Sequence, residues 1–300
     1  MTMLRLSACA KINLGLEILG RRSDGFHEIV SVTQTISLAD SIQACPATSL
    51  TVEMDPPLVD AAENLVRRAA EALALATGQH PSGRIHVTKR IPLAAGLGGG
   101  SSDAATTLLL LNRLWGTHLG AVGLAPIAAT LGSDVSLFLR GGTCLIRGRG
   151  EQVEQLPPVR PIWLVLVCPD ISPPDKTRAL YRALQPEEWG DGATTLALAD
   201  RAREGQPLDA EMLVNSFDGA AARVYPDFAR LRSSLQALTG QAFHLTGAGP
   251  SLFALFDEQN GAKTAVRALK AAGIASHLAR SVATNRRIRA SGAAIARSVR

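Results

Sequence analysis

Residues 91–103 read Ile91-Pro-Leu-Ala-Ala-Gly-Leu-Gly-Gly-Gly-Ser-Ser-Asp103, with four glycines within positions 96–100. The preceding segment, 84–91, mixes β-branched and charged residues and predicts a strand. Residues 101–115 contain four consecutive leucines and stop at Gly116, which predicts a buried helix. Glycines let backbone N–H groups turn inward, and a helix start adds unpaired N–H groups and a positive dipole. Strand, glycine loop and helix together predict a phosphate-binding site.

The loop differs from two familiar phosphate-binding loops. It does not end in Gly-Lys-Ser or Gly-Lys-Thr, which excludes a Walker A loop. Ser101 occupies the place of the third glycine in Gly-x-Gly-x-x-Gly, which disfavours a dinucleotide-binding fingerprint. A second glycine loop, Thr246-Gly-Ala-Gly-Pro-Ser251, follows later. Alone it is typical of a hairpin turn, but together with the first loop it suggests closure over phosphates from an opposite domain.

The length and composition suit a soluble protein with two domains or one large domain. The chain has 300 residues, of which 46% are hydrophobic and only 4% aromatic, so Leu, Ala and Val must build the core. Its four cysteines form neither a zinc motif nor a disulfide framework, which suits a reducing cytoplasm. The longest apolar runs are far too short to span a membrane. We therefore expect a cytoplasmic protein without a membrane partner.

The positive charge is concentrated at the C-terminus. The chain has 31 basic and 26 acidic residues, a net charge of +5, and residues 281–300 hold five arginines and no acid. The remainder has 26 of each sign and is formally neutral. We therefore expect no specific nucleic-acid partner and a basic, disordered tail at 286–300.

Strands and helices are mixed without strict alternation, which predicts an α+β fold. Strands are predicted at 4–20, 28–44, 50–54, 84–91, 138–147, 162–168, 243–245 and 252–256. Helices are predicted at 61–76, 101–115, 124–131, 176–184, 194–203, 209–219, 226–238 and 262–272. Pro157-Pro158 marks the predicted domain boundary.

Several polar residues stand out, although each alone has an ordinary interpretation. Lys11 and Asn13 share one face of an otherwise apolar strand. A lysine at such a position is commonly a surface residue whose ammonium group reaches solvent. His27 lies in a predicted loop, where histidines are commonly solvated. Asp134 follows Gly132-Ser133 at the end of a predicted helix and before apolar strand material, where an acid often caps a turn.

Their order along the chain carries more information. The segments Lys11-Ile-Asn13, Asp24-Gly-Phe-His-Glu28, Pro92–Asp103, Leu131-Gly-Ser-Asp134 and Thr246–Ser251 resemble the GHMP kinase superfamily from about residue 8 to residue 285. The resemblance implies a ribosomal protein S5 domain 2-like N-terminal domain at 1–157, with ATP and substrate bound between it and a ferredoxin-like C-terminal domain at 158–285.

The resemblance also implies roles for individual residues. Asp134 matches the catalytic base and Lys11 its partner, and magnesium is expected to arrive with ATP on unassigned protein ligands. The substrate-binding positions are matched by Asn13, Phe26, His27, Thr177 and Tyr181, with His27 contacting cytosine. The ATP-binding positions are matched by Asn64, Leu65, Pro92, Leu93, Ala94, Ala95, Gly96, Leu97, Gly98, Gly99, Gly100, Ser101, Ser102, Gly247 and Gly249.

Within the superfamily, Ala10-Lys-Ile-Asn-Leu14 followed by Asp-Gly-aromatic-His is most similar to kinases of the non-mevalonate isoprenoid pathway. This implies ATP-dependent phosphorylation of the 2-hydroxyl of diphosphocytidyl-methylerythritol by a monomer or weak homodimer. The alternatives are a homoserine or mevalonate type of GHMP kinase, and a non-catalytic nucleotide- or RNA-binding protein on the same fold. Three positions depart from the common family pattern: Phe26 replaces tyrosine, Ala94 replaces glycine and Ser136 replaces proline.

Overall fold

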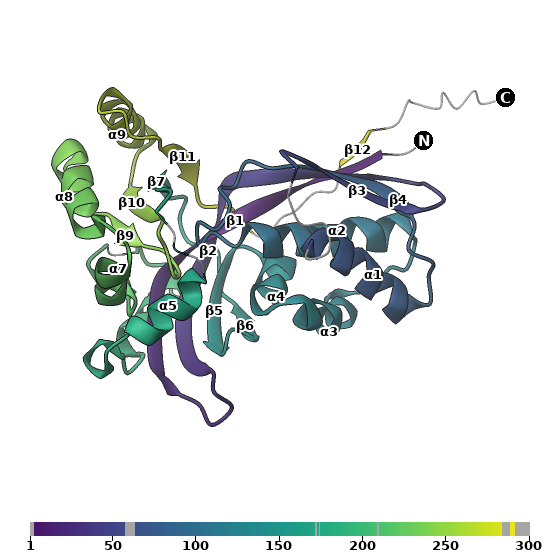
Figure 1. Cartoon of the computed structure of the whole chain (residues 1–300), viewed down its shortest axis with the longest axis horizontal. Coiled ribbons are helices and arrows are strands. Elements are labelled where there is room, and N and C mark those ends of the chain that lie inside the picture. Colours follow the sequence, from purple (N-terminus) through teal and green to yellow (C-terminus); the bar gives the residue numbers. More distant parts are fainter. Residues whose placement is uncertain are drawn as a thin grey trace.

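The computed structural model describes residues 3–57, 64–171, 173, 175–208, 210–283 and 289–291 (Figure 1). The elements up to residue 155 are β1 (Met3–Arg21), β2 (His27–Cys45), β3 (Leu50–Asp55), α1 (Leu65–Thr77), β4 (Gly83–Thr88), α2 (Gly99–Leu114), α3 (Ala121–Leu131), α4 (Ser133–Arg140), β5 (Thr143–Gly148) and β6 (Gln152–Gln155). Those after residue 155 are β7 (Trp163–Val167), α5 (Lys176–Ala183), η1 (Pro186–Glu188), α6 (Ala193–Arg203), η2 (Ala210–Met212), β8 (Val214–Asn215), α7 (Asp218–Val224), α8 (Phe228–Thr239), β9 (His244–Leu245), β10 (Leu252–Phe256), α9 (Gln259–Ala271), β11 (His277–Arg280) and β12 (Arg289–Ser291).

The first sheet is built around two long antiparallel strands. Its order is β12-β1-β2-β4-β3, with β5 and β6 extending from β2 and with β8 paired to β1. Helices α1 to α4 lie together on one face of this sheet (Figure 1). The core between them contains mostly Leu, Ala, Ile and Val, with Phe138 as its one buried aromatic residue among those that the structure describes. This composition agrees with the low aromatic content of the sequence.

The second sheet is smaller and lies at the other end of the molecule (Figure 1). Its strand order is β11-β7-β10-β9, and all its pairings are antiparallel. A middle cluster joins the two sheets, because Ile12 of β1 packs in one core with Leu164 of β7 and Leu198 of α6. The long strand β1 therefore runs from one half of the molecule into the other. The candidate residues Lys11 and Asn13 on β1 therefore lie close to both halves of the molecule.

The structure confirms most predicted elements, including the two long strands and the helix after the first glycine loop. Two predictions are wrong. Residues 133–140 form the helix α4, so the strand predicted at 138–147 begins only at Thr143. The helix predicted at 209–219 is replaced by η2, β8 and the start of α7, because β8 pairs in parallel with β1.

The C-terminal tail also differs from its prediction at one point. Residues 289–291 pair with Met3–Arg5 of β1, so these three residues are ordered as a strand. The other tail residues, and the predicted helix start at 61–63, lie outside the described residues. The domain boundaries at 157 and 285 stay predictions.

Candidate active site

The first glycine loop rests directly on β1. The backbone N–H of Lys11 donates to Leu97 O at 3.0 Å, and Ser102 Oγ donates to Cys9 O at 2.6 Å. Gly98 is the N-cap residue of α2, and no side chain caps this helix start. The N–H groups of the first turn therefore have no partner within the helix, and they are available to an anion.

A cavity of about 260 Å³ lies over this helix start. Its lining comprises Leu65, Lys89, Ile91, the loop residues 92–101 and Lys176. Ala94 has a φ of 52°, in the left-handed region that residues with a Cβ rarely adopt. A glycine at this position would adopt the same conformation without strain. The cavity has the backbone donors and the lysines that phosphate groups require.

The second glycine loop packs against the first. Gly96 has a φ of 80°, and a Cβ placed on it would lie 2.9 Å from Gly249 O and 3.0 Å from Thr246 O. Backbone from the two halves of the chain therefore meets here at a distance that excludes any side chain. The backbone of the second glycine loop therefore packs directly against the backbone of the first.

Lys11 and Asn13 lie where β1 departs from regular pairing with β2. Its register shifts between Cys9 and Lys11 and again between Asn13 and Gly15, and such bulges redirect side chains. Lys11 Nζ donates to Asn13 Oδ1 at 2.7 Å. Asn13 Nδ2 donates to Ser31 Oγ at 2.8 Å, so the amide is fixed from both sides. Asn13 thereby orients the lysine.

Asp134 lies in the first turn of α4. Burial lowers the pKa of the Lys11 ammonium, and the negative charge of Asp134 opposes this shift. Burial raises the pKa of the Tyr181 phenol, and Asp134 raises it further. The carboxylate of Asp134 is therefore within electrostatic range of both Lys11, under the glycine loop, and Tyr181, on α5.

A larger cavity of about 1100 Å³ adjoins the first and shares Ala94 and Lys176 with it. Its lining comprises Gly25, Phe26, His27, Ala94, Arg149, Asp170, Pro173, Asp175, Lys176, Thr177, Arg178 and Tyr181. We call it the acceptor cavity and the smaller one the glycine-loop cavity. Thr177 and Tyr181 are four residues apart on α5 and therefore share one helix face.

Aromatic rings line one side of the acceptor cavity. His27 and Tyr181 are stacked with ring centroids 4.3 Å apart, and Tyr181 meets Phe217 edge-on at 4.9 Å. Arg149 lies over the ring of Phe26, 5.0 Å from its centroid. The stacked pair leaves no room for a third ring between its members. A bound base must therefore stack on an outer face or separate them.

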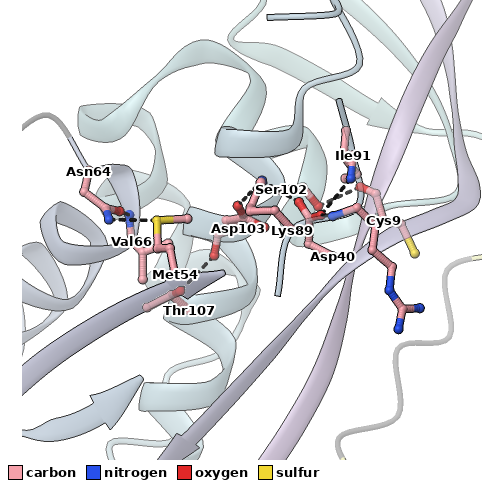
Figure 2. A network of polar contacts seen from close by, with 11 residues as sticks. Cys9, Asp40, Met54, Asn64, Val66, Lys89, Ile91, Ser102, Asp103 and Thr107 are labelled. Carbon is pink, nitrogen blue, oxygen red and sulfur yellow. Dashed lines mark hydrogen bonds and ion pairs between the residues drawn. The ribbon is translucent and has the colours of Figure 1, made fainter. Parts of the chain in front are cut away.

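A buried network of ion pairs and hydrogen bonds lies beside the first glycine loop (Figure 2). Lys89 Nζ lies 2.5 Å from Asp40 Oδ2 and 2.6 Å from Asp103 Oδ2, and all three side chains are at most 5% exposed. Asp40 Oδ1 also accepts the N–H of Ile91 at 2.8 Å. Burial raises the pKa of Asp103 to about 7, although Lys89 opposes the shift. The network joins β2, the end of β4 and the start of α2.

The structure brings most of the predicted residues to the two cavities, with a few exceptions. Ser102 is buried and its hydroxyl is held by Cys9 O, so Ser101 alone of the two serines lines the glycine-loop cavity. Asn64 caps α1 by accepting the N–H of Val66. Seven predicted residues line neither cavity, and they include both catalytic candidates: Lys11, Asn13, Asn64, Ser102, Asp134, Gly247 and Gly249.

Four basic residues that line the cavities were not predicted. They are Lys89, Arg149, Lys176 and Arg178. Lys89 lies in the predicted strand at 84–91, shortly before the loop, and Lys176 directly precedes Thr177. Their positions beside predicted motifs were the available signal. Within the described ranges, no three acidic, histidine or cysteine side chains gather as a metal site. No helix there is long and apolar enough to cross a membrane.

Comparison with known proteins places this geometry in a family. The model of the GHMP kinase N-terminal domain matches residues 64–142, and that of the GHMP kinase C-terminal domain matches residues 194–275. A 4-diphosphocytidyl-2-C-methyl-D-erythritol kinase from Dehalococcoides mccartyi is 40% identical over 262 residues, which cover 87% of this chain and 92% of that protein. The chain belongs to this family of GHMP kinases.

Solved structures agree with the family assignment. The crystal structure of a 4-(cytidine 5'-diphospho)-2C-methyl-D-erythritol kinase superposes with a TM-score of 0.79 at 35% identity, covering 92% of this chain and 98% of that one. A homoserine kinase from Cytophaga hutchinsonii superposes with a TM-score of 0.72 at 17% identity, covering 96% of this chain and 97% of that one. The second likeness shows the GHMP kinase fold alone.

Proposed function

We propose that this GHMP kinase transfers the γ-phosphoryl group of ATP to the 2-hydroxyl of 4-diphosphocytidyl-2-C-methyl-D-erythritol, in the non-mevalonate pathway of isoprenoid precursor synthesis. The observation that carries the proposal is the position of Asp134, whose charge acts on Lys11 beside the glycine loop and on Tyr181 in the acceptor cavity. A carboxylate whose charge acts on both of these groups is suited to serve as the base. The relatives named for this substrate supply its identity.

The reaction requires positioning of the two substrates and neutralisation of charge, and it needs no covalent intermediate on the enzyme. Phosphoryl transfer passes through a loose transition state, so catalysis comes mainly from alignment and neutralisation of charge. Asp134 accepts the proton of the attacking hydroxyl late in the reaction, when that proton has become acidic. The positive charge of Lys11 attracts the negative charge that develops on the transferred group. Asn13 holds Lys11 in place through their hydrogen bond of 2.7 Å.

Magnesium is expected to enter with ATP. Mg²⁺ retains several waters and is commonly held by substrate phosphates with one or two protein oxygens. The Ser101 hydroxyl lines the glycine-loop cavity and fits that role, whereas the Asp103 carboxylate is occupied by Lys89. The metal would neutralise phosphate charge beside the start of α2.

The acceptor cavity suits a ligand with a base and a diphosphate. Phe26, His27 and Tyr181 offer stacking surfaces, and Thr177 offers a hydroxyl. Burial, followed by the charge of Arg21, lowers the pKa of His27, so its ring is neutral at pH 7 and can both donate and accept. We infer hydrogen bonding of this ring to cytosine.

The decisive experiment measures ADP release with Mg-ATP and diphosphocytidyl-methylerythritol, with homoserine and mevalonate as competing acceptors. Asp134→Ala should lower kcat by about 10²- to 10⁴-fold, the usual contribution of a general base. Asp200→Asn, which removes an exposed carboxylate paired with Arg203 on α6, is the matched control and should leave the rate unchanged. Turnover of another acceptor alone would overturn the substrate assignment, and full activity of Asp134→Ala would exclude its role as base.

The remaining parts of the proposal concern the setting of the enzyme. We infer a cytoplasmic protein that acts on a small molecule as a monomer or weak homodimer, without specific nucleic-acid binding. The free cysteines at 9, 45, 144 and 168 suit a reducing compartment. Size-exclusion chromatography with light scattering tests the oligomeric state, and deletion of residues 286–300 should leave kinase activity intact.

A further inference from the structure

Lys176 occupies the junction of the two cavities. It is the first residue of α5 and lines both the glycine-loop cavity and the acceptor cavity. Its ammonium donates to the carbonyl oxygens of Ala94 and Gly249. Ala94 belongs to the first glycine loop and Gly249 to the second. The side chain therefore lies where the two loops and the two cavities meet.

The charge of this lysine is not neutralised by the protein. In the part of the chain that the structure describes, no carboxylate pairs with Lys176. A lysine ammonium has three N–H donors, and carbonyl groups occupy only two of them. One donor and the full positive charge remain for another partner. Partly buried cations without a counter-ion are costly, so such a position is typical of a site that receives an anion.

We propose that Lys176 binds and positions a phosphate group of one of the two substrates at the junction of the two cavities. The inference rests on the proposed function for the two sources of that phosphate: the terminal phosphates of ATP, or the diphosphate of the acceptor. Both are anionic and both would enter from cavities that Lys176 lines. A charge-assisted hydrogen bond from the ammonium can serve either one.

Charged groups of both signs surround Lys176. The charge of Lys11 acts on Lys176, whereas Lys89 is already paired with two buried carboxylates. The acceptor cavity adds two arginines and two acids. These four are Arg149, Asp170, Arg178 and Asp175. Burial, followed by repulsion from Lys11, lowers the pKa of Lys176 to about 8. A bound phosphate would raise that pKa, so proton uptake and phosphate binding are linked.

The test measures binding rather than turnover. Isothermal titration calorimetry of the full-length protein at pH 7 compares adenylyl imidodiphosphate with cytidine diphosphate, in wild type and in Lys176→Met. We expect about ten- to a hundredfold weaker binding of one of the two ligands, the usual loss for a charge-assisted hydrogen bond. Loss confined to the ATP analogue identifies the nucleotide phosphates, and loss confined to cytidine diphosphate identifies the acceptor. Arg182→Met removes an exposed charge from the same helix outside both cavities and should bind both ligands normally.

A second variant keeps the charge and separates binding from a structural role. Lys176→Arg should bind the affected ligand, and the ratio of wild-type to Lys176→Arg affinity should fall about tenfold from pH 7 to pH 9, because only the lysine deprotonates. A purely structural clamp between the loops would lower the melting temperature of Lys176→Met without this pH-dependent ratio. Binding of both ligands to Lys176→Met within twofold of wild type, or a constant ratio, overturns the proposal. Because no acceptor turnover is needed, absence of kinase activity would refute the proposed function and leave this result to stand.

Discussion

Replacement of Gly98 by alanine should strain the glycine loop at its junction with α2. Gly98 has a φ of 70°, and an added Cβ would lie 2.7 Å from Phe138 Cζ and 3.3 Å from Lys11 Cγ. The left-handed conformation costs an alanine about 1–2 kcal/mol. Forcing a methyl group against the fully buried Phe138 costs about 1–3 kcal/mol more, because a packed core yields little. The free energy of unfolding should therefore fall by about 2–5 kcal/mol.

Thermal unfolding followed by circular dichroism measures this loss. With an unfolding entropy of about 2.1 cal/mol/K per residue, the 300-residue chain should lose about 3–8 °C in melting temperature. Gly100→Ala is the matched control, because Gly100 lies inside α2 and its nearest contact would be Leu65 Cδ1 at an ordinary 3.5 Å. Its melting temperature should stay level or rise slightly. Equal melting temperatures for the two variants would refute the geometry inferred for Gly98.

Other predictions concern the ionic network and the acceptor cavity. Lys89→Met leaves two buried carboxylates without their cation and should cost about 3–5 kcal/mol of stability, measured by urea unfolding at pH 7. Because the pKa of Asp103 is raised to about 7 in the folded state, the folded carboxyl holds its proton more tightly than the unfolded one, and the wild type loses stability as pH rises from about 4 to 7. Asp103→Asn lacks that titration, so its stability relative to wild type should improve between pH 5 and pH 8; a pH-independent difference would contradict the raised pKa. Tyr181→Ala should raise the KM for the acceptor about tenfold or more, since a stacked base gains about 1–3 kcal/mol, while the KM for ATP changes little; equal changes in both would argue against stacking on this ring.

The sequence predicted correctly those helices and strands whose conformation depends on residues close to one another in the chain. Both long strands and the helix after the first glycine loop follow from alternation, helix propensity and glycine punctuation, and the structure confirms them. Helix α4 was missed because eight residues with a mixed apolar pattern do not distinguish a short helix from a strand. Its C-cap, Gly141, has a φ of 68°, so the Gly141-Gly142 pair ends this helix rather than interrupting a strand. This changes the setting of Asp134 from a turn to the first turn of a helix.

The segment around β8 shows a limit of a different kind. Residues 214–215 form a strand only because β1, about 200 positions earlier, offers a parallel edge. Asn215 Nδ2 then donates to the carbonyl oxygens of Leu245 and Gly247, both at 3.0 Å, and so holds the second glycine loop. No local pattern in residues 209–219 encodes that partner. Helix propensity was therefore a poor guide where a distant strand determines the conformation.

Local sequence patterns also identified the residue types of the site but not their positions relative to one another. The motifs identified Lys11, Asn13 and Asp134 as residue types in the right order, because each motif is local. Their relative positions depend on contacts such as the bond from Asn13 N to Thr246 Oγ1 at 2.9 Å, which joins positions 233 residues apart. Lys176 was missed for this reason: nothing in its neighbours along the chain indicates that Ala94 and Gly249 converge on its ammonium. The position of this cation where the two glycine loops meet is visible only in the tertiary structure, so the electrostatics of the cleft must be derived from there.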